Sequence, residues 1–462
     1  MDYKTLNEII ATHPAEEAVA ALKEKSVVVP AWDSLEREYD PNRHPVMDKA
    51  RYPDIAHDNG TYEEVTRITY DLQRLATKRM TEMCNGIPVK RIYDPQNERQ
   101  KEVAAYLESI MQRNRINSMN VERCNMVFAG CEVMTLWFSV EQPNDLYGFH
   151  SPLKIRCANY SPMQGDELYP LFDEYGDMIA MSVGYRRKVA GDSVSFFDAY
   201  TADHHYKWTN KDGSWTLAED EQFALGKIPA IYMYRPKPIW EDSSRIVYEM
   251  EWAMSRNGNY LRKNSKPLFV VFANEAIPFG REKSETEESR AVLQFPAGSN
   301  AQYVTWAQAV DNLKFYISEL RQSFFTQLQL PDWNYEKMSQ QALSGESRKQ
   351  LFIDAQMKVK DEEGRLLEFF SREVNVVKTF LTAVLGAQYA ADIEALPVSI
   401  EITPFSINDS KEQVEVLMTA NGNKPIVSQR ESVSLLGWSD DVDGTMQELN
   451  AESMRDVFEP TM

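Results

Sequence analysis

A succession of three helical segments, interrupted first by a strand-like insert and then by a polar loop, constrains the fold of this chain more than any other feature. Proline ends the first two helices, because its ring removes a backbone N–H and clashes with the preceding turn. The segments are helices at about 243–265, 307–330 and 346–385, with Pro267 and Pro331 just beyond the first two. This layout is untypical of an enzyme. We interpret it as one subunit's share of an assembled ring.

Apolar residues in the second and third helices recur every three or four positions, which is the period of one helix face. The stripes are Val310, Leu313, Ile317, Leu320, Phe324 and Leu328 in the second helix, and Leu366, Phe370, Val374, Val377 and Leu381 in the third. We expect most of these side chains to lie in the core of the subunit. A ring would also bury part of such stripes between neighbouring copies.

The first helix differs, because its apolar positions thin out toward its C-terminal end. That end carries Tyr260 among four cations, which are Arg256, Arg262, Lys263 and Lys266. Cations are stabilised there by the helix dipole, so a purely structural explanation exists. They could equally contact phosphate groups, and the sequence leaves both interpretations open.

The rest of the chain predicts an α+β fold. Residues 1–60 are punctuated by proline and predict one short helix near Leu6–Leu22, followed by extended surface chain. A helix is expected from Thr61 onward, ending at the turn 85–89, and a second helical region covers 98–128.

Strands are predicted in the middle of the chain. Residues 132–140, EVMTLWFSV, have the composition of a buried strand. From 153 to 240 short strand-like segments alternate with turns, and EYGD at 174–177 and NKDG at 210–213 have the Asp/Gly chemistry of tight hairpins. This region therefore predicts an antiparallel sheet.

The charge of the chain bears on what it can bind. Fifty basic and seventy acidic residues among 462 give a formal net charge of −20. A general nucleic-acid binder carries a basic footprint, so that class is disfavoured. The acidity has two remaining interpretations, which are solubility through self-repulsion and a surface that DNA must pass without sticking.

Compartment and membrane signals are weak. No run approaches the roughly 18 apolar residues of a transmembrane helix, and the N-terminus lacks the apolar core of a signal peptide, so we expect neither membrane insertion nor export. The four cysteines form no C-x-x-C pair, and Cys124 and Cys131 lie in an apolar helical pattern. We expect free, packed thiols in a reducing compartment.

Motifs of catalysis are missing from the sequence. It contains no Gly-rich phosphate loop, no dinucleotide-binding fingerprint and no nucleophile elbow. His204 and His205 are neighbours in a strand-like segment, where side chains alternate between faces, so they should not bind one ion together. We predict no enzyme activity, no cofactor and no metal. A nuclease whose acidic residues converge only in three dimensions stays open as the alternative.

Several phrases, taken in their order, resemble the portal proteins of tailed bacteriophages, of the siphophage type. The resemblance covers about residues 60 to 450 and rests on NGIPV at 85–89, LYPLFDEYGDMIAMSVGYRRK at 168–188, GKIPAIYMYRPK at 226–237, SGESRKQLFIDAQMKVKDEEGRLLEFFSREVNVV at 344–377, and NGNKPIVSQRESVSLLGWSDDVDGTMQELNAE at 421–452. Two features depart from that family. The C-terminal region is short, and the sequence at 331–343, where the family has its tunnel loop, is unusual.

The resemblance implies an α+β portal-protein fold with a mixed wing domain, a two-helix stem, a small β-containing clip and a short α-helical crown. The implied divisions are an N-terminal wing at 1–242, stem helices at 243–266 and 306–330, a clip at 267–305, a tunnel loop at 331–343, the rest of the wing with its long helix and strand at 344–407, and the short crown at 408–462.

The resemblance also implies where function lies. The tunnel-loop residues expected at the DNA channel are Trp333, Asn334, Tyr335, Lys337 and Gln340; the stem cations expected to face it are Arg256, Arg262, Lys263 and Lys266; the clip residues expected to face the terminase are Arg281, Glu282, Lys283, Glu285, Glu287 and Glu288. Trp333 and Tyr335 could instead anchor the loop against a neighbouring subunit.

The function implied is a ring, usually dodecameric, at one capsid vertex of the virion, through which double-stranded DNA is packaged and later ejected. Its expected partners are the terminase large subunit, the major capsid and scaffolding proteins, and a head-completion or adaptor protein, with assembly in the host cytoplasm and no membrane. The alternative is a metal-dependent, carboxylate-based phage enzyme that processes nucleic acid.

Overall fold

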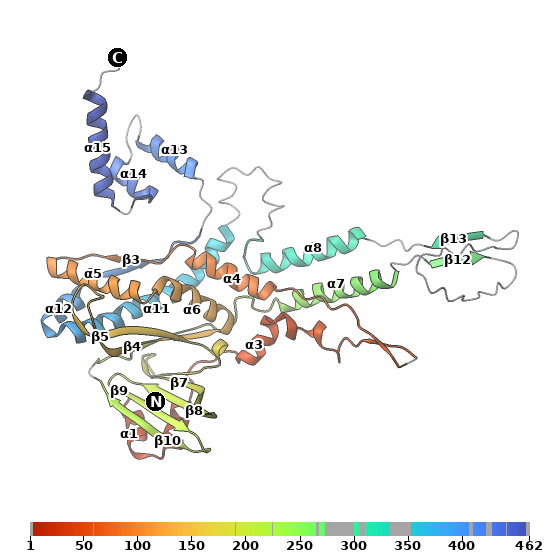
Figure 1. Cartoon of the computed structure of the whole chain (residues 1–462), viewed down its shortest axis with the longest axis horizontal. Helices are drawn as coiled ribbons and strands as arrows, with labels where there is room; N and C mark the ends of the chain where they lie inside the picture. The colour runs from red at the N-terminus through yellow and green to blue at the C-terminus, as the bar shows by residue number, and fades with distance from the viewer. Residues whose placement is uncertain are drawn as a thin grey trace.

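The computed structural model describes residues 3–58, 60–189, 191–223, 225–264, 268–272, 300–304, 310–332, 353–405, 410–421, 427–439 and 441–458. Helices α7 (Ser244–Asn264) and α8 (Val310–Gln327) run side by side away from a mixed body, toward a short antiparallel strand pair (Figure 1). The strands are β12 (Leu268–Phe272) and β13 (Asn300–Val304). Helix, strand pair, helix and the long helix α11 (Ile353–Leu385) follow one another as predicted.

One unit of the body is a five-stranded antiparallel sheet covered by the first two helices. The helices α1 (Tyr3–Thr12) and α2 (Ala15–Leu22) bury Leu6, Val19 and Leu22 against the sheet in a core of their own. The sheet has the strand order β10-β9-β8-β7-β6, with β6 at Glu167–Phe172, β7 at Met178–Val189, β8 at Asp192–Tyr200, β9 at His204–Asn210 and β10 at Trp215–Gln222. The predicted hairpin turns at 174–177 and 210–213 join β6 to β7 and β9 to β10.

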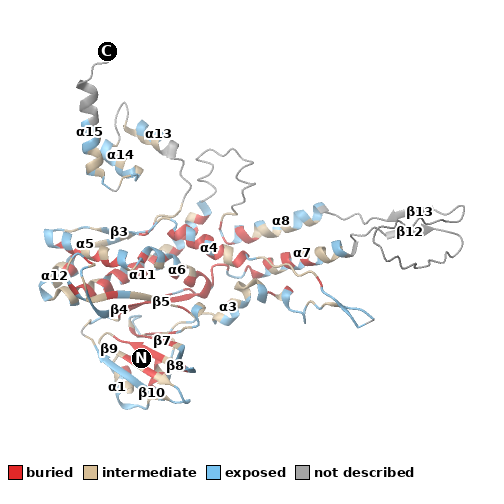
Figure 2. Cartoon of the chain, viewed as in Figure 1, coloured by how far each residue is buried: buried red, intermediate tan, exposed pale blue. Residues whose placement is uncertain are grey.

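The larger core lies between a three-stranded sheet and a layer of helices. The sheet has the order β11-β4-β5, formed by β11 (Ala230–Tyr234), β4 (Glu132–Asn144) and β5 (Ser151–Tyr160). The remaining elements of this part are α4 (Leu72–Asn85), α5 (Glu98–Arg113), α6 (Ile116–Gly130), α12 (Ala387–Ala395), and the paired strands β3 (Lys90–Tyr93) and β14 (Val398–Glu401). Figure 2 shows buried residues concentrated on α4, α6 and α11, whereas β3 and β14 contain none.

Helix α11 crosses this core and buries ionised groups as well as its apolar stripe. Its predicted stripe, from Leu366 to Leu381, is buried throughout. Glu373 on the same helix accepts hydrogen bonds from Arg123 Nη1 at 2.7 Å and Nη2 at 2.6 Å, and from Trp137 Nε1 at 3.1 Å. Removing one partner of such a buried pair leaves an uncompensated charge, which typically costs about 3–5 kcal/mol. The pair therefore fixes how α11 lies on α6 and β4.

Two features of the helical part differ from the prediction. The region 98–128 forms two helices rather than one, because Arg115 adopts a left-handed φ of 53° that cannot continue an α-helix. Residues 1–60 are not extended after residue 22, since a third helix, α3 (Trp32–Tyr39), buries Leu35. Pro41 and Pro45 begin the short 3-10 turns η1 (Pro41–Arg43) and η2 (Pro45–Met47), so proline here starts helical turns instead of excluding them.

Cys124 and Cys131 are packed as predicted, and His204 and His205 lie in the strand β9. Cys124 and Cys131 are buried free thiols, and burial raises their pKa values to about 11 and about 12. His204 stacks on Tyr206, whereas His205 stacks on Tyr200, so the two rings lie against different neighbours. Within the described ranges, no group of three or more His, Cys, Asp or Glu could hold a metal ion.

The C-terminal helices stand apart from the body (Figure 1). They are α13 (Ser410–Asn421), α14 (Gln429–Leu436) and α15 (Val442–Phe458), and Ser428 with Glu431 forms a capping box at the start of α14. Among the side chains described in these three helices none is buried, and Trp438 and Met418 are exposed. None of the helices in the described part of the chain is long and apolar enough to span a membrane.

Candidate functional site

The two projecting helices, which we call the stem, are half embedded in the body. Near the body, Met250 of α7 and Phe324 of α8 are buried in the main core. Farther out, Leu261 is 51% exposed and Phe315 is 68% exposed. The stripe predicted on the second helix is therefore fully buried only toward its C-terminal end, where Leu328 joins the same core.

An extended segment at 64–71, which we call the strap, lies along α7 and accounts for part of this embedding. Glu251 Oε1 accepts a hydrogen bond from the backbone N–H of Tyr70 at 2.8 Å. Ser255 Oγ accepts from Ile68 N at 2.8 Å, and Asn259 Oδ1 accepts from Thr66 N at 2.6 Å. Acceptors one helical turn apart thus meet every second residue of an extended chain.

The helix predicted from Thr61 onward is wrong up to residue 71, because residues 64–71 form the extended strap. The helix α4 begins only at Leu72. The apolar spacing of Val65 and Ile68 is compatible with a helix face, but their backbone N–H groups donate to side chains, that of Val65 to Asp54 and that of Ile68 to Ser255 of α7. Gly258 permits this approach, since a Cβ at that position would come within 2.8 Å of Thr66 Cγ2.

A buried histidine joins the start of the stem to the N-terminal segment. His44 Nδ1 lies 2.7 Å from Glu251 Oε1, and His44 Nε2 lies 2.9 Å from Glu38 O. Burial alone would lower the pKa of His44, but the hydrogen bond and the charge of Glu251 outweigh it and leave that pKa raised. Glu251 therefore holds both the strap and the η turns against α7.

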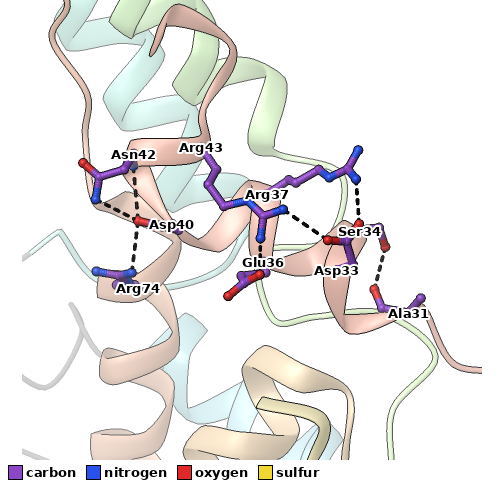
Figure 3. Close-up of polar contacts among 9 residues, drawn as sticks. All are labelled: Ala31, Asp33, Ser34, Glu36, Arg37, Asp40, Asn42, Arg43 and Arg74. Atoms are coloured by element: carbon purple, nitrogen blue, oxygen red, sulfur yellow. Dashed lines mark hydrogen bonds and ion pairs between the residues drawn. The ribbon is translucent and has the colours of Figure 1, made fainter. Parts of the chain in front are cut away.

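The segment that contains α3 and η1 also carries an exposed cluster of charged side chains. Figure 3 shows Arg43 between Asp33 and Glu36, with Arg37 also directed at Asp33. Arg37 Nη2 donates to Asp33 Oδ2 at 2.6 Å, and Arg43 Nη2 donates to Asp33 Oδ1 at 3.1 Å. The hydrogen bond from Arg43 and then the charge of Arg37 lower the pKa of Asp33. Because the cluster is open to water, we assign it little stabilising weight.

The C-terminal end of α8 is closed by a Schellman motif. Gln329 has a left-handed φ of 53°. The N–H of Leu330 donates to Phe325 O at 3.0 Å, and the N–H of Gln329 donates to Thr326 O at 3.1 Å. Leu330 and Phe325 are both buried in the core, which is the apolar contact usual for this motif. The chain thus leaves the stem in a fixed direction.

Three cations hold the residues that follow, 328–332, which we call the loop root. Arg321 donates to both carboxylate oxygens of Asp332 at 2.9 Å, and Arg79 Nη1 lies 3.6 Å from Asp332 Oδ1 and also donates to Pro331 O. Both guanidinium groups lie over the ring of Phe325. A bidentate, charge-assisted pair is among the strongest polar contacts a protein makes.

The third cation of the loop root comes from α11. Lys358 is buried, and its Nζ donates to Leu328 O at 2.6 Å. Burial lowers the pKa of Lys358. Helices α4, α8 and α11 thus converge on five residues at the point where the chain leaves the stem.

The predicted site residues are only partly placed. Arg256 is exposed, and its guanidinium lies 5.9 Å from the ring centroid of Trp252. Arg262 is exposed and donates to the backbone oxygen of Glu64, the first residue of the strap, at 2.9 Å. The remaining predicted positions lie outside the described residues or side chains; they are Lys263 and Lys266, the tunnel-loop set Trp333, Asn334, Tyr335, Lys337 and Gln340, and the clip set Arg281, Glu282, Lys283, Glu285, Glu287 and Glu288.

Neither the strap nor the loop root was predicted from the sequence. A signal for the strap exists, since Glu251, Ser255 and Asn259 form a polar stripe with a step of four on a helix that would otherwise bury that face. The loop root has no comparable local signal, because Arg79 and Pro331 are 252 positions apart.

Comparisons with known proteins identify a family that matches most of the chain. A family described as "Phage portal protein, SPP1 Gp6-like" matches residues 23–457. No curated protein matches the chain. Among solved structures, a chain of "Neck of empty GTA particle computed with C6 symmetry" is 11% identical with a TM-score of 0.41, covering 92% of this chain and 99% of its own. A chain of "Virion of native gene transfer agent (GTA) particle" is 10% identical with a TM-score of 0.40, covering 91% and 98%.

Proposed function

Because the chain belongs to the SPP1 Gp6-like family of phage portal proteins, we propose that copies of it form a closed ring, dodecameric in the virion, at one vertex of the capsid. Double-stranded DNA enters the head through this ring during packaging and leaves through it at ejection. The observation that carries the proposal is the extent of the family match, which includes the stem, the loop root and α11. The match leaves out only the first 22 residues and the last five.

In this proposal α7 and α8 are the stem helices that line the channel. The strand pair β12–β13 belongs to the clip at 267–305, the body at 1–242 and 344–407 is the wing, and α13–α15 form the short crown at 408–462. Leu261 and Phe315 support a stem packed between neighbours, because both are apolar and exposed in the single subunit.

The channel wall must centre a polyanion without binding it tightly. A net charge of −20 serves this purpose, since like charges repel DNA and sparse cations limit the number of phosphate contacts. The stem cations proposed to face the channel are Arg256, Arg262, Lys263 and Lys266.

The tunnel loop at 331–343 is proposed to reach the DNA from the loop root. Trp333, Asn334, Tyr335, Lys337 and Gln340 are the residues proposed to contact it. The clamp of Arg79, Arg321 and Lys358 on residues 328–332 supports this role, because a loop that meets moving DNA needs a fixed base.

The clip is proposed to dock the terminase large subunit during packaging and a head-completion or adaptor protein afterwards. The surface proposed for this consists of Arg281, Glu282, Lys283, Glu285, Glu287 and Glu288. The wing is proposed to meet the major capsid and scaffolding proteins as the ring is built into the head in the host cytoplasm.

Negative-stain imaging of the purified protein tests the ring directly. We expect closed rings with a central hole. Monomers and small open oligomers as the only species, at all protein concentrations tried, would contradict the proposal.

The loop assignment has its own test. Deleting residues 333–341 should leave rings intact but impair DNA packaging or retention, because the root stays clamped while the DNA-contacting part is gone. Shortening the hairpin turn 210–213 by two residues is the control, since that turn joins β9 to β10 in the five-stranded sheet. Packaging at the wild-type level by the 333–341 deletion would refute the assignment.

A further inference from the structure

The strand β11 forms one open edge of the three-stranded sheet, and a groove runs beside it. The groove consists of two cavities of about 610 Å3 and about 230 Å3, which share Tyr232 and Arg372 in their walls. One wall is β11 and another is the side of α11, and the remaining lining comes from the segment after α2 and from the β6–β7 hairpin, with Ser26, Val27, Phe172, Gly176 and Met178. An open strand edge next to a groove is the arrangement in which an extended peptide can add a further strand.

The register of β11 shows which backbone groups point into the groove. On the inner side Trp137 N donates to Pro229 O at 2.9 Å, and Arg235 N donates to Cys131 O at 2.7 Å. Antiparallel pairs alternate, so Ile231 and Met233 bond to β4 between these two points. The N–H and C=O groups of Ala230, Tyr232 and Tyr234 therefore point away from β4, on the side of the groove. Tyr234 is exposed there, whereas Ala230 and Tyr232 are buried in the single subunit.

The groove is more basic than the chain as a whole. Its charged lining residues are Lys227, Arg365, Arg372 and Glu368. Arg365 and Arg372 lie two turns apart on α11, and each side chain is 48% exposed. Each has one acidic neighbour on its own helix, Glu362 Oε2 at 3.2 Å and Glu368 Oε1 at 2.6 Å. The wall thus carries three cations against one anion in a protein of net charge −20.

Another edge strand, β10 of the five-stranded sheet, has the opposite charge. The strand β10 ends the order of the five-stranded sheet and is exposed from Thr216 to Gln222. Glu219, Asp220 and Glu221 follow one another on it. Since β10 and β11 belong to different sheets of one copy, the two edges are distinct patches, as a head-to-tail contact around a closed axis requires.

We propose that β10 of one copy adds as a strand to β11 of the neighbouring copy, so that the wings of the ring are joined by a shared sheet. The proposal rests on the ring proposed above. Outward backbone groups of Ala230, Tyr232 and Tyr234 provide the hydrogen bonds. Arg365 and Arg372 attract the acidic run 219–221, which makes this edge prefer β10 over other strands.

A charged edge strand can also be a device against aggregation, since charges keep other chains from pairing with it. That explanation accounts for the acidic residues on β10 but not for the cations that line the groove beside β11. The two explanations predict opposite outcomes when the charges are exchanged.

The first experiment blocks the edge of β11. Tyr234→Pro removes an outward N–H while leaving the bonds to β4 in place, and Tyr234→Phe is the matched control that keeps the N–H. Ring formation is followed by sedimentation velocity and negative-stain imaging over a series of protein concentrations. We expect Tyr234→Pro to raise the concentration needed for half-assembly at least about tenfold and Tyr234→Phe to behave as the wild type.

The second experiment exchanges charge. The double variants Arg365→Glu/Arg372→Glu and Asp220→Lys/Glu221→Lys should each impair assembly about tenfold or more, because like charges then face each other. Combining all four substitutions in one chain should restore assembly. Restoration supports the proposal even if Tyr234→Pro proves to be poorly folded.

The outcomes separate this inference from the ring itself. Wild-type assembly by the folded Tyr234→Pro protein, or by both charge-reversed doubles, overturns the shared sheet and leaves the ring standing. If the four-fold variant assembles no better than the doubles, charge pairing of these edges is also overturned. Absence of rings from the wild type removes both the ring and the shared sheet.

Discussion

The two halves of the stem are built differently. Near the body, α7 and α8 are buried, the strap lies along α7, and the loop root closes α8, with polar contacts that come from the same chain. Farther out the same helices expose Leu261 and Phe315. The chain thus packs the inner half by itself and leaves the apolar side chains of Leu261 and Phe315 in the outer half uncovered. The inner half is therefore held rigid from within the subunit, whereas under the proposed function the tip is free to contact other copies.

Truncating the inner half should have the largest effect. Phe324→Ala removes a fully buried ring, and we expect the free energy of unfolding to fall by about 3–5 kcal/mol, from lost apolar burial and the cavity left behind. Urea unfolding followed by circular dichroism measures it. Phe315→Ala, on the same helix but mostly exposed, is the control and should change the single subunit by less than about 0.5 kcal/mol. Equal losses in the two variants would abolish the contrast between the halves.

Breaking the loop root should rank second. Asp332→Ala removes the carboxylate that Arg321 and Arg79 share, and we expect a loss of about 2–3 kcal/mol, in line with hydrogen bonds to charged groups. The same unfolding assay measures it, and limited proteolysis should cut Asp332→Ala faster than the wild type. Glu319→Ala, an exposed carboxylate on α8, is the control. A loop root that resists protease equally in both variants would show that the clamp does not fix it.

The histidine contact should give a smaller, pH-dependent effect. The pKa of His44 is raised above its ordinary value of 6.5, so its contribution is fully present below 6.5 and is lost as the pH rises through the folded-state pKa. We expect the Tm of the wild type to fall above pH 6.5 by more than that of His44→Gln, which cannot titrate. The exposed His13→Gln is the control. Parallel pH profiles of wild type and His44→Gln would exclude the contact as a source of pH dependence.

The smallest effect on the single subunit belongs to the outer half. Leu261→Ser should change its unfolding by less than about 0.5 kcal/mol, since that side chain is half exposed. Under the proposed function the same change should raise the concentration at which rings form, as sedimentation velocity would show. An unaltered assembly concentration would mean that the tip of the stem is not a contact between copies.

The sequence predicted those elements whose signal is local. Pro267 and Pro331 mark the ends of the stem helices within a few residues, and the stripe from Leu366 to Leu381 correctly predicted the buried face of α11. The resemblance named the family that the match over 23–457 then showed. The helical period gave a wrong prediction at Val65 and Ile68, which lie in the extended strap. Their backbone N–H groups are satisfied by side chains distant in the chain or outside any local helix, Asp54 for Val65 and Ser255 of α7 for Ile68.

The candidate site was predicted least well, for a physical reason. Its polar contacts join residues far apart in the chain, such as Arg79 with Pro331 and His44 with Glu251, and no local pattern encodes such a pairing. A single Asp after a proline, as at Asp332, resembles any other turn residue. Only the packing of α4, α8 and α11 makes it the centre of a clamp.

The strap has a consequence for the order in which the molecule is made. Ile68 and Ser255 are 187 positions apart, so the strap leaves the ribosome long before the helix it binds. At about 5–20 residues per second this delay is roughly 10–40 s, during which Thr66, Ile68 and Tyr70 have no α7 to bond to. During this time the backbone N–H groups of the strap lack their partners on α7. A stem able to meet its neighbours therefore exists only late in synthesis.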